Sequence, residues 1–429
     1  MTRVWYASTL FGALSLAAAS TAGLLGERDE RRLLIVASTV PAPEAAAPLD
    51  SLAQFDVLRP HVDEIVRWND VIAPLHPAHW QPPAGEWPLW SRLVTERLGL
   101  ADGISELVVE SLAVAPAATL AALLPDCPVT VYSDGLMSYG PTRSALLPEL
   151  GGRVTRLLHL DLAEGLAPLL LREWDVEPVT LPAAEFTAAI AALGEPEPGP
   201  AAGAPVIVGQ YLAQLGLLSD AEELELHRDM LRGLAARGHD RVVFRPHPAA
   251  AQGHEPALRA EATRLGVTLD VPGDGLPVEA WFAAARPLLV VSCFSTALFT
   301  AARYYGCDVA SVGAELLLDR LTPFENSNRI PATLVRALVP ALSADGTLTP
   351  PPDVDTARLV EAVGYCMQPT RLPELRDAAV AHLAAHGTGE YFKRRRLQSL
   401  DLVAPTRRAV TSPTLRRTAR RLLDRVRPG

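Results

Sequence analysis

The first half of the chain alternates short apolar runs with stretches of helical periodicity. Runs too short for a helix predict buried strands, at Val4–Ala7, Leu33–Ala37, Glu64–Val66, Glu106–Val109 and Val129–Tyr132. Apolar residues three and four positions apart predict helices, at Leu10–Leu25, Pro88–Leu98 and Pro116–Leu124. Strands and helices that alternate at these lengths predict a parallel α/β sheet with helices on both faces.

A stretch rich in proline and glycine, residues 195–205, then interrupts the pattern, because it can form neither a helix nor a central strand. After it the alternation restarts. The predicted strands are Pro205–Val208, Arg241–Arg245, Val267–Val271, Leu288–Ser292 and Val309–Val312. The predicted helices are Asp220–Arg237, Glu255–Leu265, Val278–Ala285 and Thr296–Tyr305. Two later helices, Ala357–Met367 and Ala378–His386, are expected to pack back across the linker.

Two such halves joined by a linker describe the GT-B fold, in which two Rossmann-like domains face each other across a ligand-binding cleft. The length of 429 residues also exceeds what one hydrophobic core usually organises. We assign residues 1–194 to an N-terminal Rossmann-like domain and 195–205 to the linker. Residues 206–392 form a second Rossmann-like domain, and 393–429 form a basic tail.

The N-terminus allows two interpretations. Arg3 followed by an apolar run to Ala19 has the form of a secretory signal. The alternative, which we favour, is a strand, a turn at Ser8 and Thr9 and a helix, with a second strand following at the spacing of a βαβ unit. No stretch reaches the roughly 20 apolar residues that a membrane-spanning helix needs.

Charge is distributed unevenly. The net charge is −10, but residues 393–429 contain 12 basic and 2 acidic residues, so the remainder carries −20. So acidic a body argues against nucleic-acid binding. The tail is either a solvated basic arm or a peripheral contact with the anionic inner face of the cell membrane. Four scattered cysteines suit a reducing cytoplasm and show no metal-ligand spacing.

Arg245, Pro246, His247 and Pro248 follow a buried apolar run. In a doubly wound sheet this end of a strand faces the ligand cleft. An imidazole held there by flanking prolines can contact a phosphate, stabilise a departing phosphate or act as a general acid. The alternative is a structural loop histidine, and the position of His247 favours the phosphate role.

Three further sites carry candidate chemistry. Ser295 and Thr296 stand at a strand-to-helix turn, where they form either an anion site or only a helix N-cap. Glu279, in the first turn of a predicted helix, is either a ribose ligand or a surface carboxylate. Asp134, beside Gly135 at the end of a strand, is either a general base or part of a turn.

Together these elements resemble the bacterial sialyltransferases of GT-B fold, in particular the polysialyltransferase and lipooligosaccharide sialyltransferase families. Those families carry an acidic-acidic-Gly motif, a His-Pro motif and a Ser/Thr pair in this order. The matching residues are Ser133-Asp134-Gly135, His247-Pro248 and Ser295-Thr296. Pro277 and Glu279 fall where the family contacts the nucleotide ribose, and Gly209-Gln210 is also similar. The chain departs from the pattern at Ser133, where the family has an acidic residue.

The resemblance implies a glycosyltransferase that moves sialic acid from CMP-sialic acid to a surface glycan, with inversion and without a metal or other cofactor. The N-terminal domain would hold the acceptor and the second domain the CMP donor. Asp134 would be the general base, and His247 would contact the CMP phosphate with Arg245, Ser295 and Thr296 beside it.

The alternatives are a GT-B transferase for another activated donor, such as CMP-Kdo or CDP-glycerol, and a non-catalytic nucleotide-binding relative. On the acceptor side, Ser8 and Thr9 face the expected cleft. His76, His79 and Trp80 form a loop that either holds a sugar ring or packs internally. The identity of the acceptor is not readable from these residues.

Overall fold

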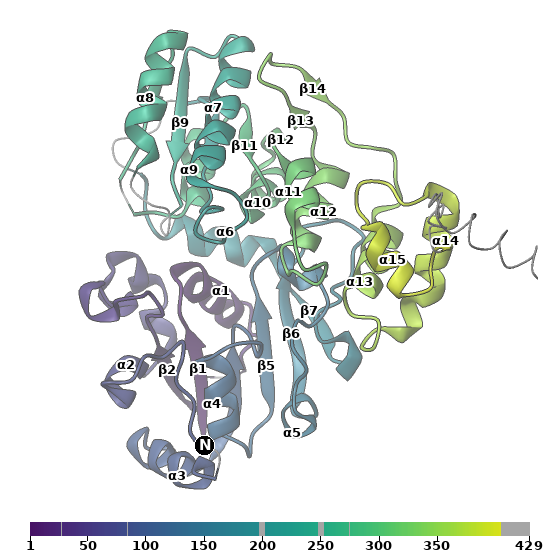
Figure 1. Cartoon of the computed structure of the whole chain (residues 1–429). Helices are drawn as coiled ribbons and strands as arrows, with labels where there is room; N and C mark the ends of the chain where they lie inside the picture. The colour runs from purple at the N-terminus through teal and green to yellow at the C-terminus, as the bar shows by residue number, and fades with distance from the viewer. Residues whose placement is uncertain (27, 84, 197–201, 248–252, 274, 405–429) are drawn as a thin grey trace, which may run out of the picture.

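The computed structural model has two stacked domains, each built on its own sheet (Figure 1). It describes the whole chain except residues 27, 84, 197–201, 248–252, 274 and 405–429. The predictions for Pro248, for the centre of the linker and for the basic tail beyond residue 404 therefore lie outside the described residues, and the membrane contact of the tail stays a prediction.

The N-terminal sheet has seven parallel strands in the order β3-β2-β1-β4-β5-β6-β7. Their bounds are β1 Thr2–Ala7, β2 Arg31–Val36, β3 Glu64–Arg67, β4 Ile104–Val109, β5 Val129–Ser133, β6 Val154–Leu160 and β7 Glu177–Leu181. The first strand lies inside the sheet between β2 and β4 and is almost completely buried, so the interpretation of the N-terminus as strand and helix is confirmed.

Helices cover both faces of this sheet. One face packs against α1 (Leu10–Thr21) and α6 (Ala183–Ala191), and the other against α2 (Trp68–Ile72), α3 (Trp87–Arg97) and α4 (Ala117–Leu123). A short helix, α5 (Pro148–Gly151), precedes β6. The predicted α/β architecture is confirmed.

The C-terminal sheet has the order β10-β9-β8-β11-β12-β13-β14 and is parallel except for its edge strand β14. Its strands are β8 Val206–Val208, β9 Arg241–Arg245, β10 Thr268–Asp270, β11 Val290–Ser292, β12 Val309–Ser311, β13 Ala341–Leu342 and β14 Leu348–Thr349. Its helices are α7 Asp220–Ala236, α8 His254–Leu265, α9 Val278–Ala285, α10 Thr296–Tyr305, α11 Ala314–Arg320 and α12 Arg329–Leu338. Two Rossmann-like domains therefore make up the GT-B fold.

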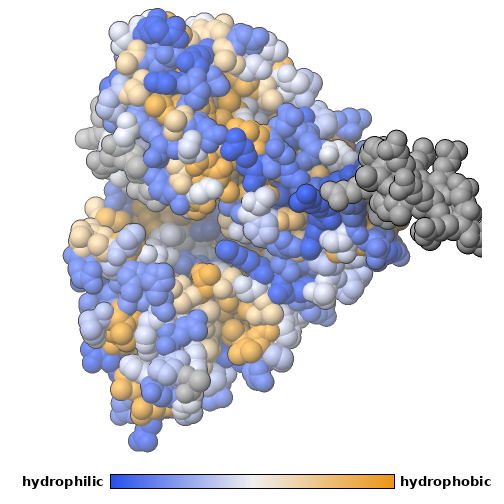
Figure 2. All heavy atoms as spheres, in the orientation of Figure 1, coloured by the Kyte–Doolittle hydropathy of each residue, from blue (hydrophilic) through white to orange (hydrophobic). Residues whose placement is uncertain are grey.

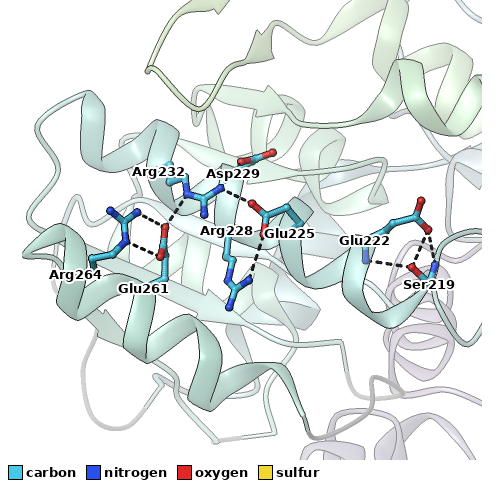
Figure 3. Close-up of polar contacts among 8 residues, drawn as sticks. All are labelled: Ser219, Glu222, Glu225, Arg228, Asp229, Arg232, Glu261 and Arg264. Carbon is cyan, nitrogen blue, oxygen red and sulfur yellow. Dashed lines mark hydrogen bonds and ion pairs between the residues drawn. The ribbon is translucent and has the colours of Figure 1, made fainter.

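Helix α7 is fixed at its start and along its outer face by polar contacts (Figure 3). Ser219 and Glu222 form a capping box at its N-terminus. Further along, Arg232 pairs with Glu225 and also with Glu261 of α8, at 2.7 Å for the latter. Glu261 is buried, and this bridge joins α7 to α8 on one face of the C-terminal sheet.

The last helices return to the N-terminal domain, as expected. They are α13 (Thr356–Met367), α14 (Arg376–His386) and α15 (Arg394–Ser399), which Figure 1 shows beside β7 and β6. Arg371 donates to the carbonyl of Thr142 at 2.8 Å, and Arg172 lies 3.5 Å from Glu361 of α13. The return of the chain braces the two domains against each other. None of the described helices is long and apolar enough to cross a membrane.

Candidate active site

Three strands of the N-terminal sheet bring polar residues together at their carboxyl ends. Ser8 follows β1, Glu110 follows β4 and Asp134 follows β5. Glu110 accepts hydrogen bonds from the backbone N–H of Ser8 at 3.2 Å and from its hydroxyl at 2.5 Å. The hydroxyl of Tyr132 lies 3.5 Å from the same carboxylate. Two carboxylates thus stand at one edge of a parallel sheet, where this fold binds its ligands.

Asp134 has a strongly perturbed acidity. Burial, followed by the negative charges of Glu110 and Glu279, raises its pKa to about 7. The side chain keeps some contact with solvent, as a group at the bottom of a cleft does. A carboxylate with this pKa is a stronger base than an exposed aspartate and is still ionised in about half of the molecules at neutral pH.

The two domains meet at this point, and the surface is hollowed between them (Figure 2). Thr296, the first residue of α10, accepts a hydrogen bond from the backbone N–H of Leu136 at 3.4 Å. A Cβ atom on Gly135 would come within 3.1 Å of the same hydroxyl, so Gly135 permits the close approach. The structure therefore brings Asp134-Gly135 and Thr296 together across the cleft, although they are far apart in the sequence.

Glu279 lies on the C-terminal side of the same cleft. It is in the first turn of α9 and is 4 % exposed, so the alternative of a surface carboxylate is wrong. Its carboxylate accepts a hydrogen bond from the hydroxyl of Thr300 at 2.9 Å, and burial raises its pKa. Pro277 is the residue that precedes α9 and serves as its N-cap.

Arg245 and His247 are placed differently although they share one turn. The guanidinium of Arg245 is buried, donates to the carbonyls of Pro272 and Leu276 and lies 5.3 Å above the ring of Trp281. Arg245 therefore holds the loop before α9 in place. His247 is half-buried, its ring packs 4.2 Å from that of Tyr211, and burial lowers its pKa.

The remaining predicted donor-site residues follow strands β8 and β11 of the C-terminal sheet. Gly209 and Gln210 follow β8, the strand between β9 and β11. The side chain of Gln210 accepts from the backbone N–H of Phe294 at 2.9 Å and so fixes the turn that leads into α10. Ser295 is the N-cap of α10 and accepts from Ala297 N–H at 3.2 Å. His247 and Ser295 therefore follow strands two places apart, roughly 10 Å at the usual strand spacing.

The predicted acceptor residues do not converge on Asp134, with the exception of Ser8. Thr9 caps α1 by accepting from the N–H of Gly12. The rings of His76 and His79 stack on each other at 4.9 Å, and Trp80 packs edge-on against Trp90 at the same separation. In this loop the aromatic residues thus make the packing contacts that the alternative interpretation expected.

Glu110 is the residue that the sequence reasoning missed. The predicted strand ends at Val109, and the rule that selected Asp134, a carboxylate directly after a buried strand, selects Glu110 as well. Among the described residues, no group of three or more His, Cys, Asp and Glu side chains is arranged to hold a metal ion.

Several solved structures are similar to this chain in fold. A 2,6-sialyltransferase from Photobacterium sp. JT-ISH-224, solved with CMP and lactose, is 11 % identical, with a TM-score of 0.43 over 78 % of this chain and 76 % of that one. The Escherichia coli heptosyltransferase WaaC is 14 % identical, with a TM-score of 0.39 over 72 % and 88 %. MurG from Acinetobacter baumannii is 12 % identical, with a TM-score of 0.42 over 94 % and 98 %. No curated protein sequence matches significantly.

The sequence itself gives a more specific match. A model of the alpha-2,8-polysialyltransferase family matches residues 8–314. This range spans more than half of the chain and runs from the end of β1 to the start of α11, so it includes Glu110, Asp134, His247, Glu279 and Ser295. The chain belongs to the alpha-2,8-polysialyltransferase family and is a glycosyltransferase of the sialyltransferase type.

Proposed function

We propose that the enzyme transfers sialic acid from CMP-sialic acid to a hydroxyl group of a cell-surface glycan, with inversion at the anomeric carbon. The observation that carries this proposal is the position of Asp134, whose pKa is about 7, directly across the cleft from the start of α10. A base on one side and an anion-binding helix terminus on the other suit an in-line displacement between them.

In the proposed reaction Asp134 removes the proton of the acceptor hydroxyl as its oxygen attacks the anomeric carbon of sialic acid. The bond from that carbon to the phosphate oxygen breaks, and CMP leaves with the bonding electron pair. The proton on Asp134 then passes to solvent. Asp134 acts in its ionised form, so the rate is expected to fall as the pH drops below about 7.

The departing phosphate is proposed to bind between His247 and the N-terminus of α10. Helix N-termini favour anions because their first N–H groups lack partners within the helix. The hydroxyls of Ser295 and Thr296 stand at this terminus. Burial keeps His247 neutral in the free enzyme, and a bound phosphate would raise its pKa again and favour proton donation to the leaving group.

The nucleoside is proposed to lie along the loop before α9, with Pro277 and Glu279 at the ribose and Gly209-Gln210 beneath the phosphate. Arg245 would act indirectly, because its donors already hold the carbonyls of this loop. The phosphate charge is met by a helix terminus and an imidazole in this arrangement, so we expect transfer to need no metal.

The test is a panel of donors assayed for release of the nucleotide in the presence of EDTA. We expect CMP release from CMP-sialic acid to exceed that from CMP-Kdo, and CDP-glycerol and UDP-sugars to be inactive. His247→Ala should lose at least about a hundredfold of this activity, whereas His239→Ala, at the opposite end of β9, should not. Equal activity of the His247→Ala variant, or preference for another donor, would reject the proposal.

A further inference from the structure

Ser133, the residue before Asp134, carries no charge, but a second carboxylate, that of Glu110, directly follows the neighbouring strand. Strands β4 and β5 are neighbours with Val109 opposite Val131, so Glu110 is in register with Tyr132. We propose that Glu110 supplies the second carboxylate of the active site from the neighbouring strand and, held by Ser8, sets the basicity of Asp134.

Glu110 is held in one position at the edge of the cleft. Two hydrogen bonds from Ser8, one from the backbone and one from the hydroxyl, fix its carboxylate on the side of β1. Tyr132 donates its hydroxyl hydrogen to the carbonyl of Tyr6 at 3.0 Å, and this hydrogen bond fixes the phenol beside Glu110. The carboxylate therefore has a defined position, which its effect on a neighbouring group requires.

The charge of Glu110 is not neutralised by a basic side chain among the described residues. Glu106, four positions earlier on β4, pairs with both Arg3 and Arg156. Among the described residues, Glu110 accepts its two hydrogen bonds from Ser8 and lies 3.5 Å from the oxygen of the Tyr132 phenol, and burial raises its pKa. An unpaired carboxylate in a cleft destabilises the fold, and such groups cluster at functional sites.

The negative charge of Glu110 affects the ionisation of Asp134. The titratable groups near it are Glu110, which follows β4, Glu279 of α9, Tyr132 of β5, and His159 of β6, which lines a small cavity of the N-terminal domain together with Asp134. Of these, the two glutamates carry negative charge and disfavour ionisation of Asp134, Glu110 more strongly than Glu279. Glu110 is thus a positioning residue that acts through the base and not on the substrate.

The inference rests on the proposed role of Asp134, and it has a test that needs no substrate. The carboxyl carbon of Asp134 is titrated by carbon-13 NMR in the free protein, with Asp134→Asn to assign the signal. We expect the midpoint to fall by about one pH unit in Glu110→Gln, because one neighbouring negative charge is removed. Glu110→Asp should restore most of the shift, and Glu149→Gln, an exposed glutamate of α5, should leave the midpoint unchanged.

The pH profile of kcat/KM provides the second readout. In Glu110→Gln the acid limb should move down by the same amount as the NMR midpoint, while the affinity for CMP is retained. A midpoint and an acid limb that stay where they are in the wild type would overturn the role of Glu110. If CMP-sialic acid proves not to be the donor, the proposed function fails, but the NMR titration still decides the interaction between Glu110 and Asp134.

Discussion

The buried position of Asp134 lowers the stability of the folded protein at neutral pH. Its pKa of about 7 means that the folded protein holds a proton that the unfolded chain has lost above pH 4. The contribution of Asp134 to the free energy of unfolding therefore falls as the pH rises from about 4 to 7, and it stays low above that range. Among the described residues no basic side chain forms an ion pair with Asp134, and its position suits the proposed role as the base.

Replacement of this residue should separate stability from activity. We expect Asp134→Asn to lose roughly 10²–10⁴-fold in kcat and yet to unfold at a higher temperature than the wild type at pH 8. The gain in the free energy of unfolding should reach up to about 4 kcal/mol, because the pKa of the carboxyl differs by about three units between the folded and unfolded states, and it should shrink toward pH 4. Calorimetry across this range checks the stability. A variant that is less stable at pH 8, or one that keeps its activity, would contradict this account of the base.

At the scale of elements, the first turn of α10 contains both a helix cap and the proposed phosphate site. Ser295 caps the helix by accepting from Ala297 N–H, and we propose that the same hydroxyl also contacts the phosphate. The capping alternative considered from the sequence is therefore confirmed for Ser295, and it does not exclude the other role. Ser219 also caps a helix, α7, where it forms a capping box with Glu222, and it has no proposed contact with the phosphate, so it serves as the comparison.

The two serines should respond alike in stability and differently in binding. Ser295→Ala and Ser219→Ala should each lower the free energy of unfolding by about 1 kcal/mol, since each removes an N-cap. Only Ser295→Ala should also weaken the binding of CMP, by roughly tenfold or more, because it removes a hydrogen bond to a charged group. Isothermal titration with CMP measures this difference. Equal CMP affinities for the two variants would mean that Ser295 only caps α10 and does not bind the phosphate.

The sequence predicted the second half correctly up to β12, whereas α11, α12, β13 and β14 were not predicted. Strand β9 and helices α9 and α10 have the predicted bounds, because each is a plain apolar run between clear glycine, proline or polar breaks. The expectation that Val129–Tyr132 is the last strand of the first half is wrong, since β6 and β7 follow it. Both were missed for local reasons: β6 carries Arg156 and His159 among its apolar residues, and β7 is an edge strand that contains Pro178.

The site was predictable only one residue at a time. The rule that polar residues after buried strands face the cleft selected Asp134, His247 and Ser295. It cannot say which of them meet, because the contact of Leu136 with Thr296 joins residues 160 positions apart. The buried state of Glu279 and the hydrogen bonds of Arg245 to its own loop likewise depend on tertiary packing.

At the scale of the whole molecule, contacts between the domains set the width of the cleft. Beside the contact at Thr296, Arg303 of α10 forms ion pairs with Asp161 at 2.6 Å and Glu164 at 3.1 Å in the N-terminal domain. These pairs are partly exposed, so each contributes little to stability. Their effect is to hold α10, and with it the proposed phosphate site, opposite the carboxyl ends of β5 and β6.

The most direct test of this account is a crystal structure of the enzyme with CMP bound. The account predicts the phosphate within hydrogen-bonding distance of the His247 imidazole and of the hydroxyls of Ser295 and Thr296. The ribose should lie at Glu279, and Asp134 should face the phosphate across the cleft. The central claim would be contradicted by a phosphate bound away from both His247 and the start of α10. It would also be contradicted by a bound CMP whose phosphate Asp134 does not face.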